Sequence, residues 1–303
     1  MILLRNKVNS ERDKEKKASL QYAIGTLLLI LTTVLWGSTF IITKNITQEV
    51  APFWYLGLRF LLALLLFLPF LPRMRRINKR VIRAGIITGF IYFISIAVQT
   101  IGLQLTSAGK AGFITGLNTL IVPFISWGFY KRKVKKHIWI AVFLSIGGMA
   151  FLLLDTSVEF LIGDILVLLC AFGFAFYIIS VDRNINYVDI YVYLIIQLII
   201  ITSLSFLMSF LTREDLTIPL NNLNFWGIMI YMGTITSGLT FLFQNWSKKK
   251  VGPHITAVIF TLEPVFALLF ASVIIGSEEL TIREIIGCVF IFIAILIVVL
   301  KRK

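Results

Sequence analysis

Charged residues are scarce in this sequence of 303 residues: 15% are Asp, Glu, Lys or Arg, whereas 58% are hydrophobic. Soluble domains carry about 25% charged residues, so an ordinary water-soluble globule is excluded. Acidic residues are the scarcer kind, with 15 Asp and Glu against 29 Lys and Arg. Because the basic residues lie in the gaps between apolar runs, their excess indicates the positive-inside bias of a membrane protein and argues against a nucleic-acid partner.

Cysteine and histidine are rarer still, with two of each. Cys170 and Cys288 lie inside apolar runs without a neighbour at metal-ligand spacing, so the sequence predicts neither a disulfide framework nor a metal site. His137 and His254 each stand alone near the end of an apolar run. No H-E-x-x-H, Walker A or G-x-S-x-G motif occurs. We therefore expect no enzyme, no cofactor and no ATP hydrolysis by this chain.

Long apolar runs make up most of the sequence. About 20 residues cross the ~30 Å hydrocarbon core of a bilayer. Ten such runs are predicted, at 20–43, 52–71, 84–104, 109–129, 137–154, 162–181, 188–210, 223–244, 253–275 and 282–300. The first follows a charged tail, residues 1–19, and is too long for the apolar part of a signal peptide, so we expect it to stay in the membrane. The prediction is an all-α integral membrane protein with ten transmembrane helices.

The basic residues also predict how these spans are oriented. With a cytoplasmic N-terminus, 24 of the 29 Lys and Arg fall on the cytoplasmic side, four fall outside and Arg59 lies within a span. The cytoplasmic set includes Lys248, Lys249 and Lys250, which follow the eighth span. The bias alternates correctly across all ten spans. We therefore expect both termini in the cytoplasm and a multi-pass protein of the plasma membrane, of the bacterial inner-membrane type.

Three local patterns recur in the same order in the two halves of the chain. The pairs are Trp36 to Phe40 with Phe172 to Phe176, Tyr55 and Arg59 with Tyr193 and Gln197, and Thr115 and Pro123 with Thr256 and Pro264. Chance recurrence of Phe, Gly and Pro in apolar helices is the alternative explanation. Because each half has five spans, the second enters the membrane the other way up, as in many secondary transporters. The prediction is a charged tail at 1–19 and two five-helix repeats, 20–154 and 155–303, in a 5+5 inverted-topology arrangement.

Several of these segments match a known family. They are Trp36 to Phe40, Arg59 with Phe60, Gly112 to Leu117 leading to Val122 and Pro123, Leu262 to Val265, and Ile286 with Gly287. With ten spans in two halves, the sequence resembles the EamA-type transporters of the drug/metabolite transporter superfamily from Leu20 to Leu300. The resemblance implies a secondary transporter of a small organic metabolite such as an amino acid, more often exported than imported, acting by alternating access.

Arg59 and Glu263 are the two charges predicted deep in the membrane. A charge inside a span is costly unless it is paired or faces water. Arg59 is either an anion-binding or gating residue of a central cavity, or a side chain that snorkels outward or binds backbone carbonyls. Glu263 either binds a cationic group or carries a coupling proton, or it hydrogen-bonds backbone exposed near Pro264. Their estimated depths differ by about 10 Å, which argues against a direct ion pair.

Polar and aromatic residues at helical spacing complete the predicted binding site. The expected cavity residues besides the two charges are Trp36, Phe40, Gln99, Thr115, Asn118, Gln197, Thr256 and Phe260. An apolar cavity with a few polar groups suits a small organic solute, although packing or an interfacial belt is the alternative role for the rings. Pro123 and Pro264 each remove a backbone hydrogen bond inside a span, so we expect them to act as hinges.

Other classes of function remain open at this point. A lipid-head-group flippase requires charges along a lateral opening, and a membrane-embedded lipid enzyme requires clustered titratable groups at one membrane face. An accessory or sensor subunit that does not transport is a third alternative. The expected partners are the lipid bilayer, a small-molecule substrate and, for one coupling mode, a proton; exchange and facilitated diffusion are equally compatible. The sequence is compatible with a monomer or a homodimer.

Overall fold

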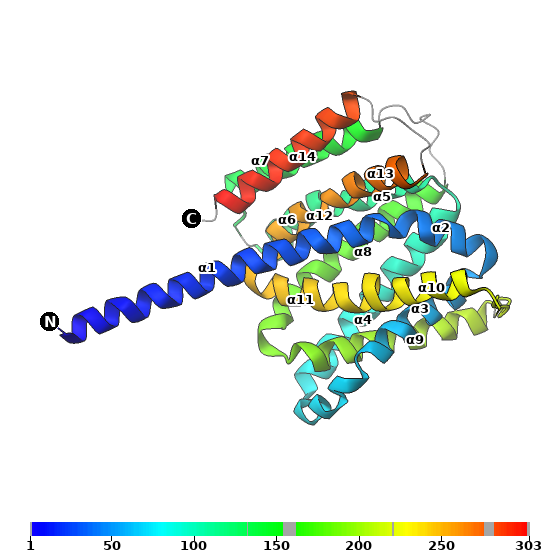
Figure 1. The fold of residues 1–303 in the computed structure, drawn as a ribbon, viewed down its shortest axis with the longest axis horizontal. Helices are drawn as coiled ribbons and strands as arrows, with labels where there is room; N and C mark the ends of the chain where they lie inside the picture. The colour runs from blue at the N-terminus through cyan, green and yellow to red at the C-terminus, as the bar shows by residue number, and fades with distance from the viewer. Residues whose placement is uncertain (1, 132, 154–161, 220, 276–281, 302–303) are drawn as a thin grey trace.

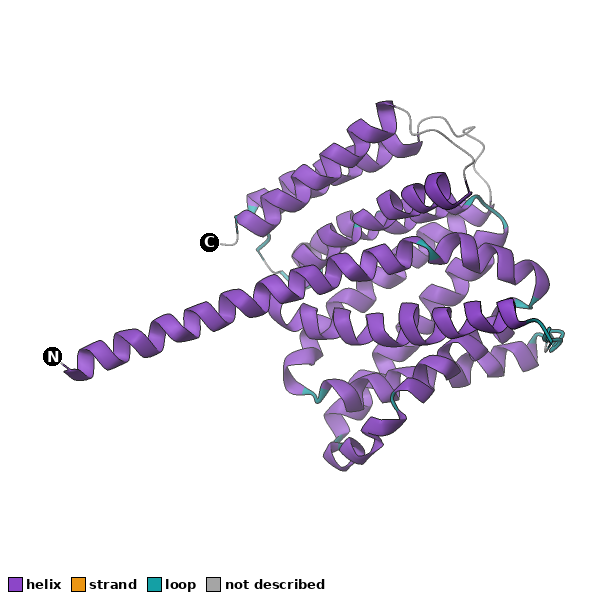
Figure 2. Ribbon diagram, viewed as in Figure 1, coloured by secondary structure: helices purple, strands orange, loops and turns teal. Residues whose placement is uncertain are grey.

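The chain is almost entirely helical. The computed structural model describes residues 2–131, 133–153, 162–219, 221–275 and 282–301. Helix makes up 88% of the structure, and no strand occurs in these described ranges, as Figure 2 shows. The all-helical part of the fold prediction is therefore confirmed.

The helices follow the predicted apolar runs closely. In the first half they are α1 (Ile2–Gly37), α2 (Thr39–Glu49), α3 (Pro52–Leu66), the 3₁₀ helix η1 (Leu68–Arg76), α4 (Lys79–Gln104), α5 (Ala108–Gly116), α6 (Asn118–Gly128) and α7 (Lys136–Leu153). In the second half they are α8 (Ile162–Asn184), the 3₁₀ helix η2 (Ile185–Tyr187), α9 (Ile190–Leu211), α10 (Leu223–Ile230), the π-helix η3 (Tyr231–Leu239), α11 (Thr240–Val251), α12 (Pro253–Phe260), α13 (Leu262–Ile275) and α14 (Ile282–Leu300).

Local sequence signals explain several helix ends. The side chains of Asn78 and Asn222 accept hydrogen bonds from backbone N–H groups in the first turns of α4 and α10, and so does Asp189 at the start of α9. Such caps satisfy donors that have no partner inside the helix. Gly252, with φ of +88°, separates α11 from α12, and Pro253 then begins α12, where a missing N–H costs nothing.

The number of spans is smaller than predicted when it is counted by length and apolarity. Seven helical stretches in the described residues are long and apolar enough to cross a bilayer, or eight if α3 and η1, bent by 73°, form one span. The predicted spans 137–154 and 282–300 correspond to shorter apolar helices, Lys136–Phe151 and Ile285–Leu300. The structure therefore supports a multi-pass protein, and the count of ten remains a prediction.

Two predicted spans are divided by a single residue where the sequence predicted proline hinges. The run 109–129 breaks at Leu117, between α5 and α6, and the run 253–275 breaks at Thr261, between α12 and α13. Pro123 lies inside α6, beyond the break. Pro264 lies in the first turn of α13, where its missing N–H removes no intrahelical bond. The breaks are thus next to the prolines and not at them.

The helices pack into one bundle, with α7 and α14 side by side at one edge (Figure 1). Helix α4 packs against α8 and α9, and α1 packs against α11 and α13. Gly37, at the end of α1, permits one of these contacts: a Cβ there would lie 2.7 Å from Cβ of Phe266. Helices α1 and α2 form one apolar stretch, Glu15–Glu49, and Trp36, Thr39 and Phe40 on either side of the break after Gly37 line an interior cavity.

Candidate functional site

A cavity lies among α1, α2, α3, α4, α5, α6, α8, α11, α12 and α13. Its lining consists of Trp36, Thr39, Phe40, Thr43, Arg59, Tyr92, Ile96, Gln99, Thr100, Leu103, Thr115, Asn118, Phe174, Tyr177, Ile178, Gln244, Phe260 and Glu263. Eight of the ten binding residues predicted from the sequence are in this lining; Gln197 and Thr256 are not. The cavity volume is about 50 Å³, which is room for a few water molecules.

Arg59 is buried and held by neutral oxygens. Its side chain is 4% exposed, and Nε donates to Oγ of Ser237 at 2.7 Å. The two terminal nitrogens make longer hydrogen bonds, to the Tyr55 hydroxyl at 3.4 Å and to Oγ1 of Thr236 at 3.5 Å. No carboxylate lies within 4.0 Å of it in the described part of the chain. The guanidinium is therefore fixed in place while its charge is not neutralised.

The π-helix η3 provides most of these contacts. In η3 the wide turn presents Thr236 and Ser237 toward α3, and Gly233 allows the close approach, since a Cβ there would lie 2.8 Å from the Arg59 carbonyl. The carbonyl of Thr236 also accepts from Nε1 of Trp36 at 3.0 Å. The Trp36 ring packs on Phe260, with 5.1 Å between centroids. π-Helical turns are frequent at functional sites, and this one fixes both a cation and an aromatic wall of the cavity.

Glu263 lines the same cavity without a protein partner. It is half-buried in the first turn of α13, directly after the break at Thr261. Neither a hydrogen bond nor an ion pair reaches its carboxylate from any residue that the structure describes. The charges of Arg59 and Glu263 both act on the Tyr92 hydroxyl. The cavity lining therefore contains a guanidinium and a carboxyl group that do not pair with each other.

The other predicted residues divide into two groups. Gln99 donates through Nε2 to Oγ1 of Thr115 at 2.9 Å, and Asn118 is 5% exposed with Oδ1 unpartnered, so these three line the cavity as a polar strip. Gln197 instead donates to Oγ1 of Thr88 at 2.6 Å, and Thr256 donates to the Gly252 carbonyl at 2.7 Å. Both are fully buried outside the cavity lining, which corrects the prediction that they face it.

The same arrangement of helices occurs in known proteins. A model of the EamA-like transporter family matches residues 23–154 and 161–300. The chain belongs to this family. This EamA-like protein is 32% identical over 275 residues to an uncharacterized transporter of Archaeoglobus fulgidus, over 90% of this chain and 85% of that protein. It is 22% identical to the uncharacterized transporter YoaV of Bacillus subtilis, over 87% of this chain and 92% of that protein.

A solved structure shows the same fold. One crystal structure of a protein at 20% identity has a TM-score of 0.76 and covers 91% of this chain and 98% of that chain. The resemblance predicted from the motifs is thus confirmed: the EamA-like chain is a multi-pass membrane protein with a transporter role. In its described residues, no group of three or more His, Cys, Asp or Glu side chains is placed to hold a metal ion.

One basic residue of this protein is buried, although the sequence predicts it in a connection between spans. Lys248 was counted with the lysines of a cytoplasmic connection, but α11 continues to Val251 and buries Lys248 to 1% exposure. Its Nζ donates to Oε1 of Gln244 at 2.9 Å and lies 4.5 Å from the centroid of the Tyr177 ring. Because Lys248 belongs to a run of three lysines, the sequence gives little indication that it is buried. The one pattern that could indicate it is the i to i+4 spacing from Gln244, which places both residues on one helix face.

Proposed function

We propose that this protein is a secondary carrier that exports a small zwitterionic solute of the amino-acid type across the plasma membrane. The observation that carries the proposal is the pair of uncompensated charges, Arg59 and Glu263, in one small cavity. A buried charge without a counter-charge is costly. An anionic solute neutralises Arg59 alone and a cationic solute neutralises Glu263 alone. A solute with a carboxylate and an ammonium group neutralises both, so the cavity chemistry favours a zwitterion.

The proposed architecture is ten transmembrane helices in a 5+5 inverted repeat, with a tail at 1–19 and repeats at 20–154 and 155–303. In support, the fourth predicted span of each half is broken by one residue, at Leu117 and at Thr261. Discontinuous helices at corresponding positions of two repeats are typical of substrate sites in secondary transporters. The distribution of basic residues supports cytoplasmic termini.

The proposed mechanism is alternating access around this cavity. Movement at the two breaks, next to Pro123 and Pro264, changes which face of the membrane the cavity opens to. Arg59 holds the carboxylate, Glu263 binds the ammonium group, and the rings of Trp36, Phe40 and Phe260 contact the apolar part of the solute. Energy comes from exchange or from a proton carried by Glu263 after the ammonium group leaves. Export rests on the family resemblance alone.

Thermal stabilisation of the detergent-purified protein against the twenty amino acids, nucleosides, sugars, amines and vitamins tests the proposal. A ligand at 100 times its Kd stabilises the folded state by about 2.7 kcal/mol, a measurable shift of the melting temperature. We expect an amino acid to stabilise the wild type, and neither Arg59→Ala nor Trp36→Ala to respond although both remain folded. Stabilisation by none of the zwitterions would reject the proposal.

Analogues that lack one charge separate the two roles. For a leucine ligand, 3-methylbutylamine lacks the carboxylate and 4-methylpentanoate lacks the ammonium group. We expect both to bind more weakly than the amino acid, because each leaves one of the two charges unpaired. Equal binding of the amine and the amino acid would show that Arg59 does not recognise a carboxylate.

A further inference from the structure

Lys248 is a buried cation for which the transport scheme above has no role. Its ammonium group has three N–H donors, and the hydrogen bond to Gln244 is made by one of them. Within the described ranges no carboxylate lies within 4.0 Å of it, and Asp182 is the acidic residue that acts on it over a longer distance. Lysine is almost never fully buried unless it is paired, and an ionisable residue inside a span indicates a functional site.

Two neighbours of Lys248 also have unused hydrogen-bond donors. Gln244 is fully buried and Tyr177 is 2% exposed, and both line the cavity. Among the described residues, Nε2 of Gln244 and the hydroxyl of Tyr177 have no partner that meets the geometric criteria for a hydrogen bond, although the amides of Asn245 and Gln197 lie near that hydroxyl. Leaving buried polar groups unpaired is unfavourable. Together with the two N–H groups of Lys248 that Gln244 does not use, these atoms form a set of donors with spare hydrogen-bonding capacity.

The chemistry of this donor set selects its ligand. An ionised carboxylate only accepts hydrogen bonds, through two oxygens, and hydrogen bonds from an ammonium group to it are strong. The amides of Asn245 and Gln197 are polar neighbours of the Tyr177 hydroxyl, and in the part of the chain that the structure describes each has a buried oxygen without a donor at hydrogen-bond distance. The Tyr177 hydroxyl can therefore turn between these oxygens and a bound carboxylate.

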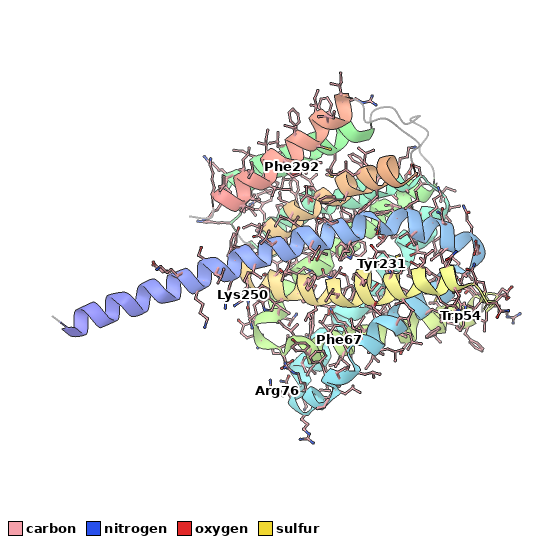
Figure 3. The ribbon with its side chains drawn as sticks, in the orientation of Figure 1. Trp54, Phe67, Arg76, Tyr231, Lys250 and Phe292 are labelled. Carbon is pink, nitrogen blue, oxygen red and sulfur yellow. The ribbon has the colours of Figure 1, made fainter. Side chains whose placement is uncertain are left out.

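The donors of Lys248, Gln244 and Tyr177 lie on the side of the cavity toward the end of α11. Lys248 follows Gln244 by one helical turn on the same face of α11, in the direction of the helix end. Beyond it, Lys249 is exposed and Lys250 donates to Oε1 of Gln21 at 2.7 Å. Figure 3 shows Lys250 at the end of α11 beside α1, whereas Trp54 lies at the far end of the bundle. Along α11, Lys248 thus lies between Gln244, which lines the cavity, and the end of the helix.

We propose that Lys248, Nε2 of Gln244 and the Tyr177 hydroxyl form a second binding subsite for the substrate carboxylate. The carboxylate occupies it while it moves between Arg59 and the face at which α11 ends. This inference rests on the proposed function and deepens it, because it names the group that receives the carboxylate on the cytoplasmic side. For an exporter it is the entry subsite, and Arg59 is the central one.

Transport measured separately from the two faces tests this subsite. Everted and right-side-out membrane vesicles containing the full chain are given each of the twenty carbon-14-labelled amino acids separately, and initial uptake rates are compared over a range of concentrations. In everted vesicles we expect Lys248→Gln to raise KM roughly tenfold or more, because an ion-assisted hydrogen bond is lost. In right-side-out vesicles we expect KM to stay within about twofold, because binding there begins at Arg59. Lys248→Arg should restore most of the affinity, and Lys249→Gln, an exposed neighbour, should change neither KM.

A second variant separates an anion subsite from a purely structural lysine. Gln244→Glu places a carboxylate beside the ammonium group of Lys248, so that the subsite is filled by the protein itself. We expect uptake into everted vesicles to fall while the melting temperature stays at or above that of the wild type. Uptake that is retained in this variant would overturn the proposal.

The remaining outcomes are also decisive. Equal loss from both faces in Lys248→Gln, with a lower melting temperature, assigns Lys248 a structural role and overturns the subsite. If the wild type moves label and Lys248→Gln matches it, the subsite alone is rejected. If the wild type moves no label, the amino-acid function is rejected, and the carboxylate subsite with it.

Discussion

The two ionisable residues of the cavity, Arg59 and Glu263, differ in how many hydrogen bonds they make to other side chains. Arg59 is buried and donates three hydrogen bonds to side-chain hydroxyls on α3 and η3. Glu263 is half-buried, and no described residue donates to it; it lies in the first turn of α13. There the partial positive charge of the helix N-terminus favours a carboxylate. One charge is thus fixed by specific side chains and the other is favoured by backbone dipoles.

Because of this difference, we expect substitutions of the two residues to affect ligand affinity and folding stability differently. Removing a group that other side chains hold disturbs both the ligand and the fold, because the partners lose their hydrogen bonds. Removing a group that has no partner affects the ligand alone. The same reasoning links Glu263 to proton coupling, since a carboxylate without hydrogen bonds can gain a proton without breaking contacts.

The largest effect is expected at Arg59. Arg59→Gln removes the cation, and truncating one member of a buried charge pair costs about 2–5 kcal/mol, or roughly 30-fold to more than 1000-fold in Kd for a zwitterion. The melting temperature should fall as well, because Ser237 and Thr236 lose their donor. Ligand titration by thermal shift measures both quantities. Unchanged affinity in folded Arg59→Gln would show that Arg59 has only a structural role.

A smaller effect, confined to function, is expected at Glu263. Glu263→Gln keeps the shape of the side chain, so we expect an affinity loss of about 1–3 kcal/mol for the zwitterion and no decrease in melting temperature. If Glu263 carries the coupling proton, the pH dependence of transport in proteoliposomes disappears as well. An unchanged rate with an unchanged pH profile would exclude Glu263 as the proton site, and a clear loss of stability would show an internal partner.

A substitution of Ser237 tests whether the hydrogen bonds that fix Arg59 contribute to ligand binding. Ser237→Ala removes the shortest hydrogen bond to the guanidinium, at 2.7 Å, and a hydrogen bond to a charged group contributes about 1.5–3 kcal/mol. We expect part of this loss in ligand affinity and part in stability. Ser209 provides the matched control, because it is buried on α9 outside the cavity, and its hydroxyl has no hydrogen-bond partner among the residues that the structure describes. Equal effects of Ser209→Ala and Ser237→Ala would contradict the assignment.

The smallest effect is expected at Trp36. Trp36→Phe keeps a ring against Phe260 and removes the hydrogen bond to the Thr236 carbonyl. A neutral hydrogen bond contributes about 1 kcal/mol, so we expect roughly a fivefold loss of affinity. Trp127→Phe, at a side chain that is 60% exposed, serves as the control for general effects of tryptophan removal. A loss larger than that of Arg59→Gln would reverse the proposed order of the two residues.

Patterns along the chain predicted many residues of the cavity lining. Such patterns depend on helical periodicity and on the free-energy cost of placing a charge inside an apolar span. Arg59 and Glu263 stood out since charges are rare in apolar runs, and Gln99 with Thr115 followed from helical spacing. Gln197 corresponds to Arg59 in the comparison of the two halves, and Thr256 shares a helical face with Phe260 and Glu263, but neither pattern determines which way a side chain points. Pro264 was read as a hinge, yet a proline in a first turn is also compatible with the start of a new helix, as at α13.

The sequence by itself determined the helical class, the membrane setting and the family, because all three follow from local apolarity, basic loops and short motifs. Only the tertiary structure decided how the charges are used. That Ser237 holds Arg59, that Glu263 has no partner among the described residues, and that Lys248 is buried behind Tyr177 all depend on contacts between distant segments. Residues 178 positions apart in the chain meet at Arg59 and Ser237, and no pattern along a single helix records such a contact.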